Sequence, residues 1–381
     1  MTTPTLMQML QALIGTPSIS SVSPNWDQSN QKVIDQLAEW LKELGFEIEV
    51  LPIPGYPGKA NLVASIGSGP EGLVLSGHTD TVPCDEKLWA SNPFQLTEAD
   101  NRLYGLGTAD MKSFFALVIE AVRDLPLDQL KHPLTLLATA DEESSMCGAQ
   151  HLVETNRRLG RHAIIGEPTG LKPIRTHKGI AMEAVRLIGR SGHSSNPALG
   201  INALEGMHRV IGEILAWRGE LEQRYRNPLF EVETPTLNLG HIHGGDNPNR
   251  ICGQCELHFD LRPLPGMHLD ELRSELDKRL QGLLTNSDLK LELESLFSGI
   301  EAMETPADAR IVQTVEEMTG HQAGAVAFGT EGPYLNQLGM ETLILGPGSI
   351  DQAHQPNEYI ELGQIKPTIE LIQSLVKKFC L

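Results

Sequence analysis

Residues 73–80 read LVLSGHTD, an apolar run that ends in a histidine and, two positions later, an aspartate. Three later apolar runs also end in polar residues or a glycine-rich loop: LTLLATADEE over 134–143, IIGE over 164–167 and LILGPG over 343–348. Apolar residues at helical spacing over 29–44 and a mostly apolar stretch over 111–122 predict helices in the same part of the chain. Buried strands that alternate with helices are typical of α/β proteins. The sequence therefore predicts an α/β fold with a mixed, mostly parallel sheet and helices on both faces.

The middle of the chain has a different pattern. From residue 179 to residue 297 the expected order is strand, helix, strand, strand, helix, strand. Over 250–262 apolar and polar residues alternate, which predicts an antiparallel strand with one wet face. We therefore expect a smaller α+β domain of ferredoxin-like type over 179–297. It would be inserted into an α/β domain made of 1–178 and 298–381.

Potential metal ligands follow each of the four apolar runs. They are His78 after the first run, the pair Glu142 and Glu143 after the second, Glu167 after the third and His354 beyond the last. A fifth candidate, Asp110, comes just before the apolar helix. Ligands of open α/β sheets bind at the carboxyl ends of the strands, so we expect these side chains to lie close together.

The types of these side chains indicate a catalytic metal site. Two imidazoles and several carboxylates, without a thiolate, suit zinc, cobalt or manganese. Five ligands, one of them a bridging carboxylate, suffice for two ions about 3.5–4 Å apart. Each residue also has a structural interpretation: His78 and His354 as ordinary histidines, Asp110 as a helix cap, and the two glutamates as a solvated pair. Their common position at one sheet edge favours the metal site.

Several segments together resemble the metallopeptidase family of aminoacylase, carboxypeptidase G and succinyl-diaminopimelate desuccinylase. They are SGHTDTVP (76–83), LYGLGTADMK (103–112), TADEE (139–143), IGEPT (165–169) and GPGSIDQAHQPNEY (346–359). A match over 237–267 extends the resemblance to nearly the whole chain. The resemblance implies a two-metal hydrolase that removes the acyl group from an N-acylated amino acid.

The resemblance also implies a role for each ligand. His78 and Glu167 would bind one metal, Glu143 and His354 the other, and Asp110 would bridge them. Zinc is the favoured metal and cobalt the alternative.

The same resemblance implies the catalytic groups. Asp80 would hold the ring of His78, because a carboxylate behind a metal-bound imidazole fixes its tautomer. Glu142 would be the general base on a metal-bridging water. Its neighbour Glu143 can be a ligand because adjacent side chains of an extended segment point to different sides. His193, in SGHSSNP, would stabilise the oxyanion from a partner subunit, so we expect a homodimer joined through the inserted domain.

The candidate substrate-binding residues come from a spacing pattern. The family uses an asparagine and an arginine thirteen residues apart, which Asn249 and Arg262 match, with Arg250 as a competing candidate. The longer match implies N2-acetyl-L-ornithine as the favoured substrate, in arginine biosynthesis, and Glu331 could meet its ammonium group. The alternatives are a desuccinylase, a general aminoacylase or a non-catalytic family member.

Bulk properties restrict the partners and the compartment. A formal net charge of -19 disfavours nucleic acid. The chain starts Met1-Thr2-Thr3-Pro4, without the basic and apolar regions of a secretory signal, and no apolar run is long enough to span a membrane. Five dispersed cysteines suit free thiols. We therefore expect a cytoplasmic protein.

Two local motifs carry no function in this interpretation. The GSGPEG sequence at 67–72 precedes a strand, whereas a dinucleotide-binding loop precedes a helix. Cys252 and Cys255 form a single C-x-x-C without a second pair, and on a regular strand their side chains would point to opposite faces. The G-x-S-x-G elbow of serine hydrolases is absent from the sequence.

Overall fold

The computed structural model describes residues 3–381. Met1 and Thr2 at the amino terminus lie outside the described residues. The chain forms two compact units. The first contains Met1–Arg175, Thr305–Gly324 and Glu331–Leu381, and the second contains Thr176–Glu304 and Ala325–Thr330.

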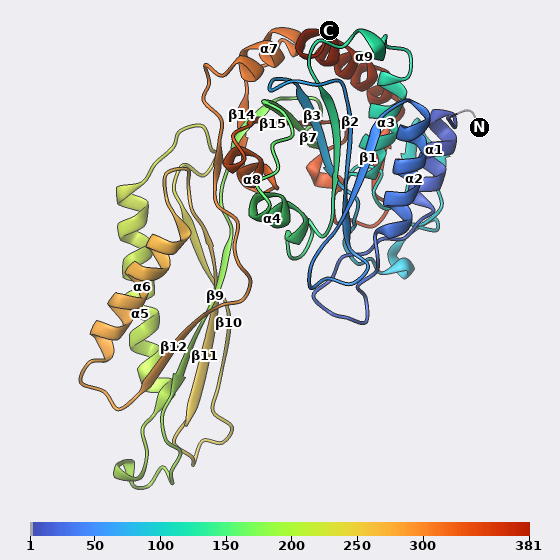
Figure 1. Ribbon diagram of the computed structural model, residues 1–381. Helices are drawn as coiled ribbons and strands as arrows, with labels where there is room; N and C mark the ends of the chain where they lie inside the picture. The colour runs from blue at the N-terminus through green and yellow to red at the C-terminus, as the bar shows by residue number, and fades with distance from the viewer. Residues whose placement is uncertain (1–2) are drawn as a thin grey trace. The chain divides into compact units, whose positions relative to one another are not determined.

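The first unit is built on a mixed sheet (Figure 1). Its strands lie in the order β1 (Glu47–Pro52), β2 (Ala60–Ile66), β6 (Leu134–Thr139), β3 (Leu73–His78), β7 (His162–Pro168), β15 (Glu341–Gly346) and β8 (Ile174–His177). The pairs β3–β6, β3–β7 and β7–β15 are parallel, whereas β1–β2, β2–β6 and β15–β8 are antiparallel. Every residue of β3, β6 and β7 is buried, as their continuous apolar runs require. The predicted α/β fold with a mostly parallel central sheet is confirmed.

Helices cover both faces of this sheet. One face packs against α1 (Leu6–Ile14), α2 (Gln31–Glu43), α3 (Lys112–Val122), α7 (Arg310–Thr319) and α9 (Leu362–Phe379), which share one hydrophobic core. On the other face lie α4 (Cys147–Glu154) and α8 (Gly332–Gln337) (Figure 1). Nearly every residue of α3 is buried, which explains its apolar composition. A small sheet of β16 (Tyr359–Glu361), β5 (Arg102–Tyr104) and β4 (Thr97–Ala99) completes the unit.

The second unit has the order β9 (Ala181–Ile188), α5 (Ala203–Arg224), β10 (Thr236–Gly244), β11 (Gln254–Arg262), α6 (Leu269–Leu284) and β12 (Lys290–Ser295). This is the predicted succession of elements. The strands form an antiparallel sheet in the order β10-β11-β9-β12, and α5 and α6 pack on one face of it. The expected strand over 250–262 is shorter than predicted, because residues 250–253 form a loop and β11 begins at Gln254. The short strands β13 (Met303–Glu304) and β14 (Gly324–Val326) pair with β8.

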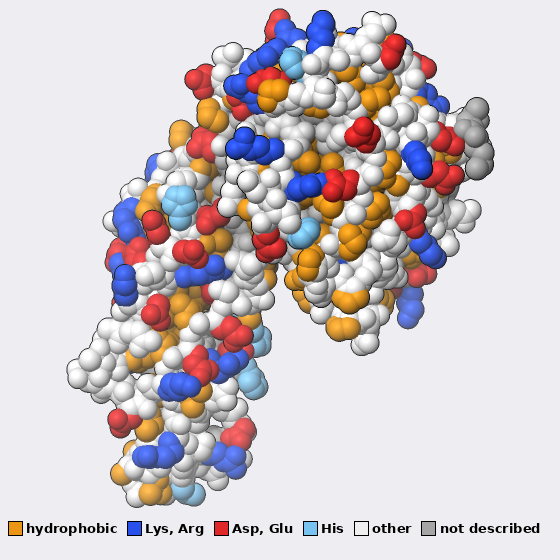
Figure 2. All heavy atoms as spheres, viewed as in Figure 1, with side chains coloured by type: hydrophobic (Ala, Val, Ile, Leu, Met, Phe, Trp, Pro, Cys, Tyr) orange, Lys and Arg blue, Asp and Glu red, His pale blue; other side chains and the backbone are white. Residues whose placement is uncertain are grey.

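Among residues 3–381, no helix is both long and apolar enough to cross a membrane. Figure 2 shows acidic and basic side chains spread over the visible face of the molecule.

Candidate metal centre

The five predicted metal ligands come together at the carboxyl end of the parallel strands. His78 is the last residue of β3, Glu167 lies near the end of β7, and Glu143 lies in the turn that follows β6. His354 is in the loop beyond β15, and Asp110 directly precedes the first turn of α3. Because β6, β3, β7 and β15 are neighbouring parallel strands, their ends place these side chains at one edge of the sheet.

The Asp110 carboxylate lies between the two imidazoles. Its Oδ1 is 2.9 Å from Nε2 of His78, and its Oδ2 is 3.4 Å from Nε2 of His354. Each imidazole therefore faces a different oxygen of one carboxylate, which is the arrangement of a bridging ligand. Asp110 does not cap the helix, since α3 has no side-chain cap hydrogen bond.

The remaining ligands flank this bridge. Both carboxylate oxygens of Glu143 lie 3.0 Å from Nε2 of His354, and Oε1 of Glu167 lies 3.7 Å from Nε2 of His78. Two ligand atoms on one tetrahedral zinc ion are separated by about 3.3 Å, given bond lengths of about 2.0–2.2 Å. The residues present thus fit two ions that share Asp110.

Burial of several carboxyl groups in this site makes the binding of positive charge favourable. The buried surroundings, and then the negative charges around them, raise the pKa of the Glu142 and Glu167 carboxyls well above the usual range. Hydrogen bonds that the His354 ring donates to the Asp110 and Glu143 carboxylates raise the pKa of His354 to about 10. Without a metal, the site therefore favours bound protons, and divalent cations would take their place.

Glu142 lies close to two of the predicted ligands, His78 and Glu167. Ligand atoms of His78, Glu142 and Glu167 all lie within 4.8 Å of one another, as do those of His78, Asp110 and Glu143. The two adjacent glutamates thus contribute to different groups. They do so from a turn and not, as predicted, from an extended segment: Asp141 has a φ of 56° and the chain turns after β6.

Asp80 supports the site differently from its predicted role. The Nδ1 atom of His78 is 3.0 Å from the backbone carbonyl oxygen of Asp80, whereas the Asp80 carboxylate is 3.7 Å away. That carboxylate instead accepts the backbone N–H groups of Glu142 and Glu143, at 3.2 and 3.1 Å. Asp80 therefore orients the His78 ring through its backbone and the glutamate turn through its side chain.

Lys59 also supports the turn. Its ammonium group is buried, and Nζ lies 2.6 Å from Asp141 Oδ1 and 2.7 Å from Asp27 Oδ1. Lys59 was not among the predicted site residues, because an isolated lysine far from the turn has no recognisable motif.

Glu358 was also not among the predicted site residues. Its side chain is 1% exposed, and its carboxylate accepts the backbone N–H groups of Gly107, Ala109 and Asp110 at 2.7–3.1 Å. A buried carboxylate thereby fixes the loop that presents Asp110. The available signal was the acidic residue four positions after His354 in the QPNEY segment.

The expectation for Glu331 is wrong. Its carboxylate is 1% exposed and accepts hydrogen bonds from the hydroxyls of Ser76 and Thr139, so it is engaged inside the first unit and does not face a substrate.

The residues predicted in the inserted domain lie at the two ends of the second unit. His193 and Asn249 are on neighbouring loops: residues 193 and 250 form an isolated β-bridge, and the Ser194 N–H donates to the Asn249 carbonyl. Arg262 ends β11, where it pairs with Asp260 at 2.9 Å. Arg250 is exposed and pairs with Asp246. The nine residues of β11 alone span about 27 Å, so within one chain Asn249 and Arg262 cannot meet the same carboxylate.

Comparisons with known proteins identify the family of this chain. The model of peptidase family M20/M25/M40 matches residues 74–378. Acetylornithine deacetylase of Photorhabdus laumondii is 49% identical over 378 residues, covering 99% of this chain and 98% of that protein. Acetylornithine deacetylase of Edwardsiella ictaluri is 51% identical over 377 residues, with the same coverage.

Solved structures share the fold at low sequence identity. An M20 family metallo-carboxypeptidase from Sulfolobus solfataricus has a TM-score of 0.75 at 18% identity and covers 98% of both chains. A dinuclear metal-binding peptidase of the M20 family from Bacillus subtilis has a TM-score of 0.67 at 14% identity, also over 98% of both chains. The family resemblance is thus confirmed: the chain belongs to peptidase family M20/M25/M40.

Proposed function

We propose that this protein is a metal-dependent amidohydrolase that converts N2-acetyl-L-ornithine and water into L-ornithine and acetate. The observation that carries the proposal is the Asp110 carboxylate, which offers one oxygen toward each of two imidazoles, while Glu142 lies close to His78 and Glu167. The substrate rests on the two acetylornithine deacetylases that share about half of its residues. This substrate would place the enzyme in arginine biosynthesis.

Two divalent metal ions would be held by His78 and Glu167 on one side and by Glu143 and His354 on the other, with Asp110 between them. We favour zinc, with cobalt as the alternative. When bound, such ions polarise the amide carbonyl and favour deprotonation of water.

Glu142 would move the proton. As the water oxygen bonds to the acetyl carbon, the Glu142 carboxylate takes the proton that this oxygen loses. When the carbon–nitrogen bond breaks, Glu142 returns the proton to the leaving nitrogen, which becomes the amine of ornithine. The raised pKa of Glu142, caused mainly by burial, suits a group that must both accept and release a proton near neutral pH.

The second unit would bind the substrate carboxylate and stabilise the oxyanion. Since Asn249 and Arg262 lie at opposite ends of β11, we propose that one substrate meets them from two different subunits. His193 lies on the loop beside Asn249 and would come from the same subunit as it. This arrangement supports a homodimer in which the inserted domain, over 179–297, serves as a lid and as the contact between subunits.

Steady-state kinetics with N2-acetyl-L-ornithine and N-succinyl-diaminopimelate at one metal loading would test the substrate. We expect kcat/KM to favour the acetyl substrate by at least about 100-fold, since polar pockets reject substrates that leave buried groups unpaired. An equal or better succinyl substrate would make the protein a desuccinylase, and a broad preference would make it a general aminoacylase. Metal binding without hydrolysis of either compound would indicate a non-catalytic family member.

A further inference from the structure

The sheet of the second unit carries three histidines that the proposed reaction does not use. His241 and His243 lie on β10, and His258 lies on the neighbouring strand β11. Both β10 histidines are exposed, and His258 is half-buried.

A bulge in β10 places these side chains on the face opposite the helices. Leu239 pairs with Phe259, and both contribute to the core beneath α5 and α6. The register then shifts between Leu239 and His241, so that Gly240 is an extra residue. Because side chains alternate between the faces, this shift turns His241 and His243 away from the core. Without the register shift, the side chains of His241 and His243 would point to the same face as Leu239, toward the core.

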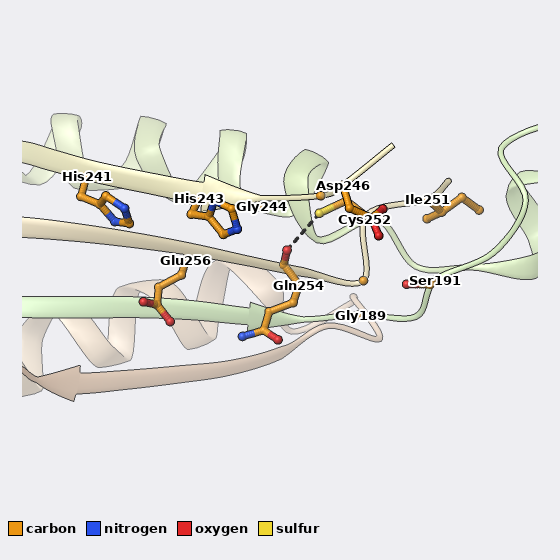
Figure 3. A pocket seen from close by; sticks show the side chains of 12 residues that line it. Gly189, Ser191, His241, His243, Gly244, Asp246, Ile251, Cys252, Gln254 and Glu256 are labelled. Carbon is orange, nitrogen blue, oxygen red and sulfur yellow. Dashed lines mark hydrogen bonds between the residues drawn. The ribbon is translucent and has the colours of Figure 1, made fainter. Parts of the chain in front are cut away.

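The three imidazoles lie on the same face of the sheet. His241 and His258 are cross-strand partners, and their ring centroids are 4.8 Å apart. His243 is two residues further along the same face of β10, opposite Glu256. In Figure 3 the rings of His241 and His243 lie next to one another along β10, with Glu256 on β11. They border a cavity of 590 Å³, which leaves room for an ion and its water ligands.

Glu256 orients His258. Its Oε1 is 2.7 Å from Nε2 of His258, which leaves Nδ1 of that ring available as a ligand. Histidines that bind metals commonly donate their other ring N–H to a carboxylate in this way. The other oxygen of Glu256 accepts from Arg186 at 2.6 Å. Arg186 also pairs with Glu292 and Glu294, so carboxylates outnumber cations on this face.

We propose that His241, His243 and His258 form an additional binding site for one divalent transition-metal ion, separate from the metal centre of the first unit. Two histidines at positions i and i+2 of a strand, with a third on the adjacent strand, provide three nitrogen ligands on one surface. Imidazole ligands favour zinc, copper and nickel over magnesium or calcium. Because His241 and His243 are exposed, a change of side-chain rotamer can direct their nitrogens toward one ion.

The probe for this site is Zn²⁺, measured by equilibrium dialysis and elemental analysis of the full-length protein. We expect the wild type to bind one equivalent more than the double variant His241→Gln/His243→Gln, while kcat/KM at saturating zinc stays unchanged. This difference does not depend on how many ions the first unit holds, so it separates the site from the proposed function. His208→Gln, which removes an exposed histidine of α5, should bind as much zinc as the wild type.

A second pair of variants guards against misfolding of the double variant. His258→Gln should also lose the additional equivalent. Glu256→Gln should keep it with an affinity lowered about 10- to 100-fold, as expected when the carboxylate behind a ligand is removed. Equal zinc content in the wild type, the double variant and His258→Gln would overturn the proposal.

Discussion

The candidate residues of the two units differ in how the fold holds them. In the first unit, His78, Asp110 and Glu167 are at most 6% exposed; His78 and Glu167 lie at the ends of buried strands, and Asp110 lies just before the buried helix α3. In the second unit, His193 and Asn249 are exposed on loops, and Arg262 ends a strand. Buried ionisable groups are stable only with compensating charge, whereas exposed ones are solvated without a partner. The first unit therefore presents a preformed cluster of potential ligands, whereas the residues proposed in the second unit lie apart on exposed segments and at a strand end.

This contrast predicts a ranking of substitutions, beginning in the buried centre. Asp110→Ala should lower the occupancy of both metals together and reduce kcat/KM by more than about 10⁴-fold, because one carboxylate faces both ion positions. Elemental analysis and kinetics on the same preparation would measure this. The control Asp128→Ala changes an exposed residue of the same unit and should leave metal content and kcat/KM unchanged. Full metal content in the Asp110 variant would exclude a bridging role.

Glu142→Gln should separate chemistry from metal binding. The variant keeps the size of the side chain, so both metals should remain, while loss of the general base should lower kcat about 10²- to 10⁴-fold. Elemental analysis and steady-state kinetics would check both expectations. Glu154→Gln, an exposed glutamate of α4, is the matched control. Turnover within a few-fold of the wild type would assign the base to another residue.

His193→Ala tests an exposed residue of the second unit. Loss of one oxyanion donor should lower kcat about 10²- to 10³-fold, with metal content unchanged. If the histidine acts across subunits, mixing this variant with Glu142→Gln should restore part of the activity, since a hybrid dimer contains one intact site. Subunit exchange would be verified by mass spectrometry. Exchange without any recovery would show that His193 serves its own subunit or has no catalytic role.

Glu358→Gln should have the smallest effect of these substitutions. The amide still reaches the loop but has one acceptor oxygen instead of two, so the three N–H groups that hold the Asp110 loop lose part of their support. We expect metal affinity, measured by chelator competition, to fall about 10- to 100-fold, with kcat largely recovered at saturating metal. Glu361→Gln, half-exposed and three residues away, should retain wild-type affinity. Wild-type affinity in the Glu358 variant would make its role purely structural.

The candidate metal centre could be predicted from the sequence because several of its residues directly follow apolar strands. Apolar runs that end in His78, Glu143 or Glu167 indicate both the buried strands and the polar edge at which they meet. The same reasoning predicted the order of elements in the second unit from the alternation of its residues. The predicted strand began four residues before β11 does, because residues 250–253 continue the alternation in the sequence but form a loop in the structure.

Long-range contacts account for what the sequence did not reveal. Glu358 meets a loop some 250 residues earlier in the chain, and Lys59 meets Asp141 across more than 80 residues, so neither contact has a local pattern. Glu331 shows the converse: its charge suggested a substrate contact, yet the fold buries it against Ser76 and Thr139.

The sequence by itself determined the fold class, the order of elements and the family, since each follows from local periodicity and motifs within short segments. Only the tertiary structure decided how the oxygens of Asp110 are shared between two imidazoles, which carboxylate holds its loop, and that Asn249 and Arg262 lie a strand length apart. The physical reason is that distances between side chains depend on strand order, register and a single bulge. Those are set by packing across the whole chain and not by any one segment of it.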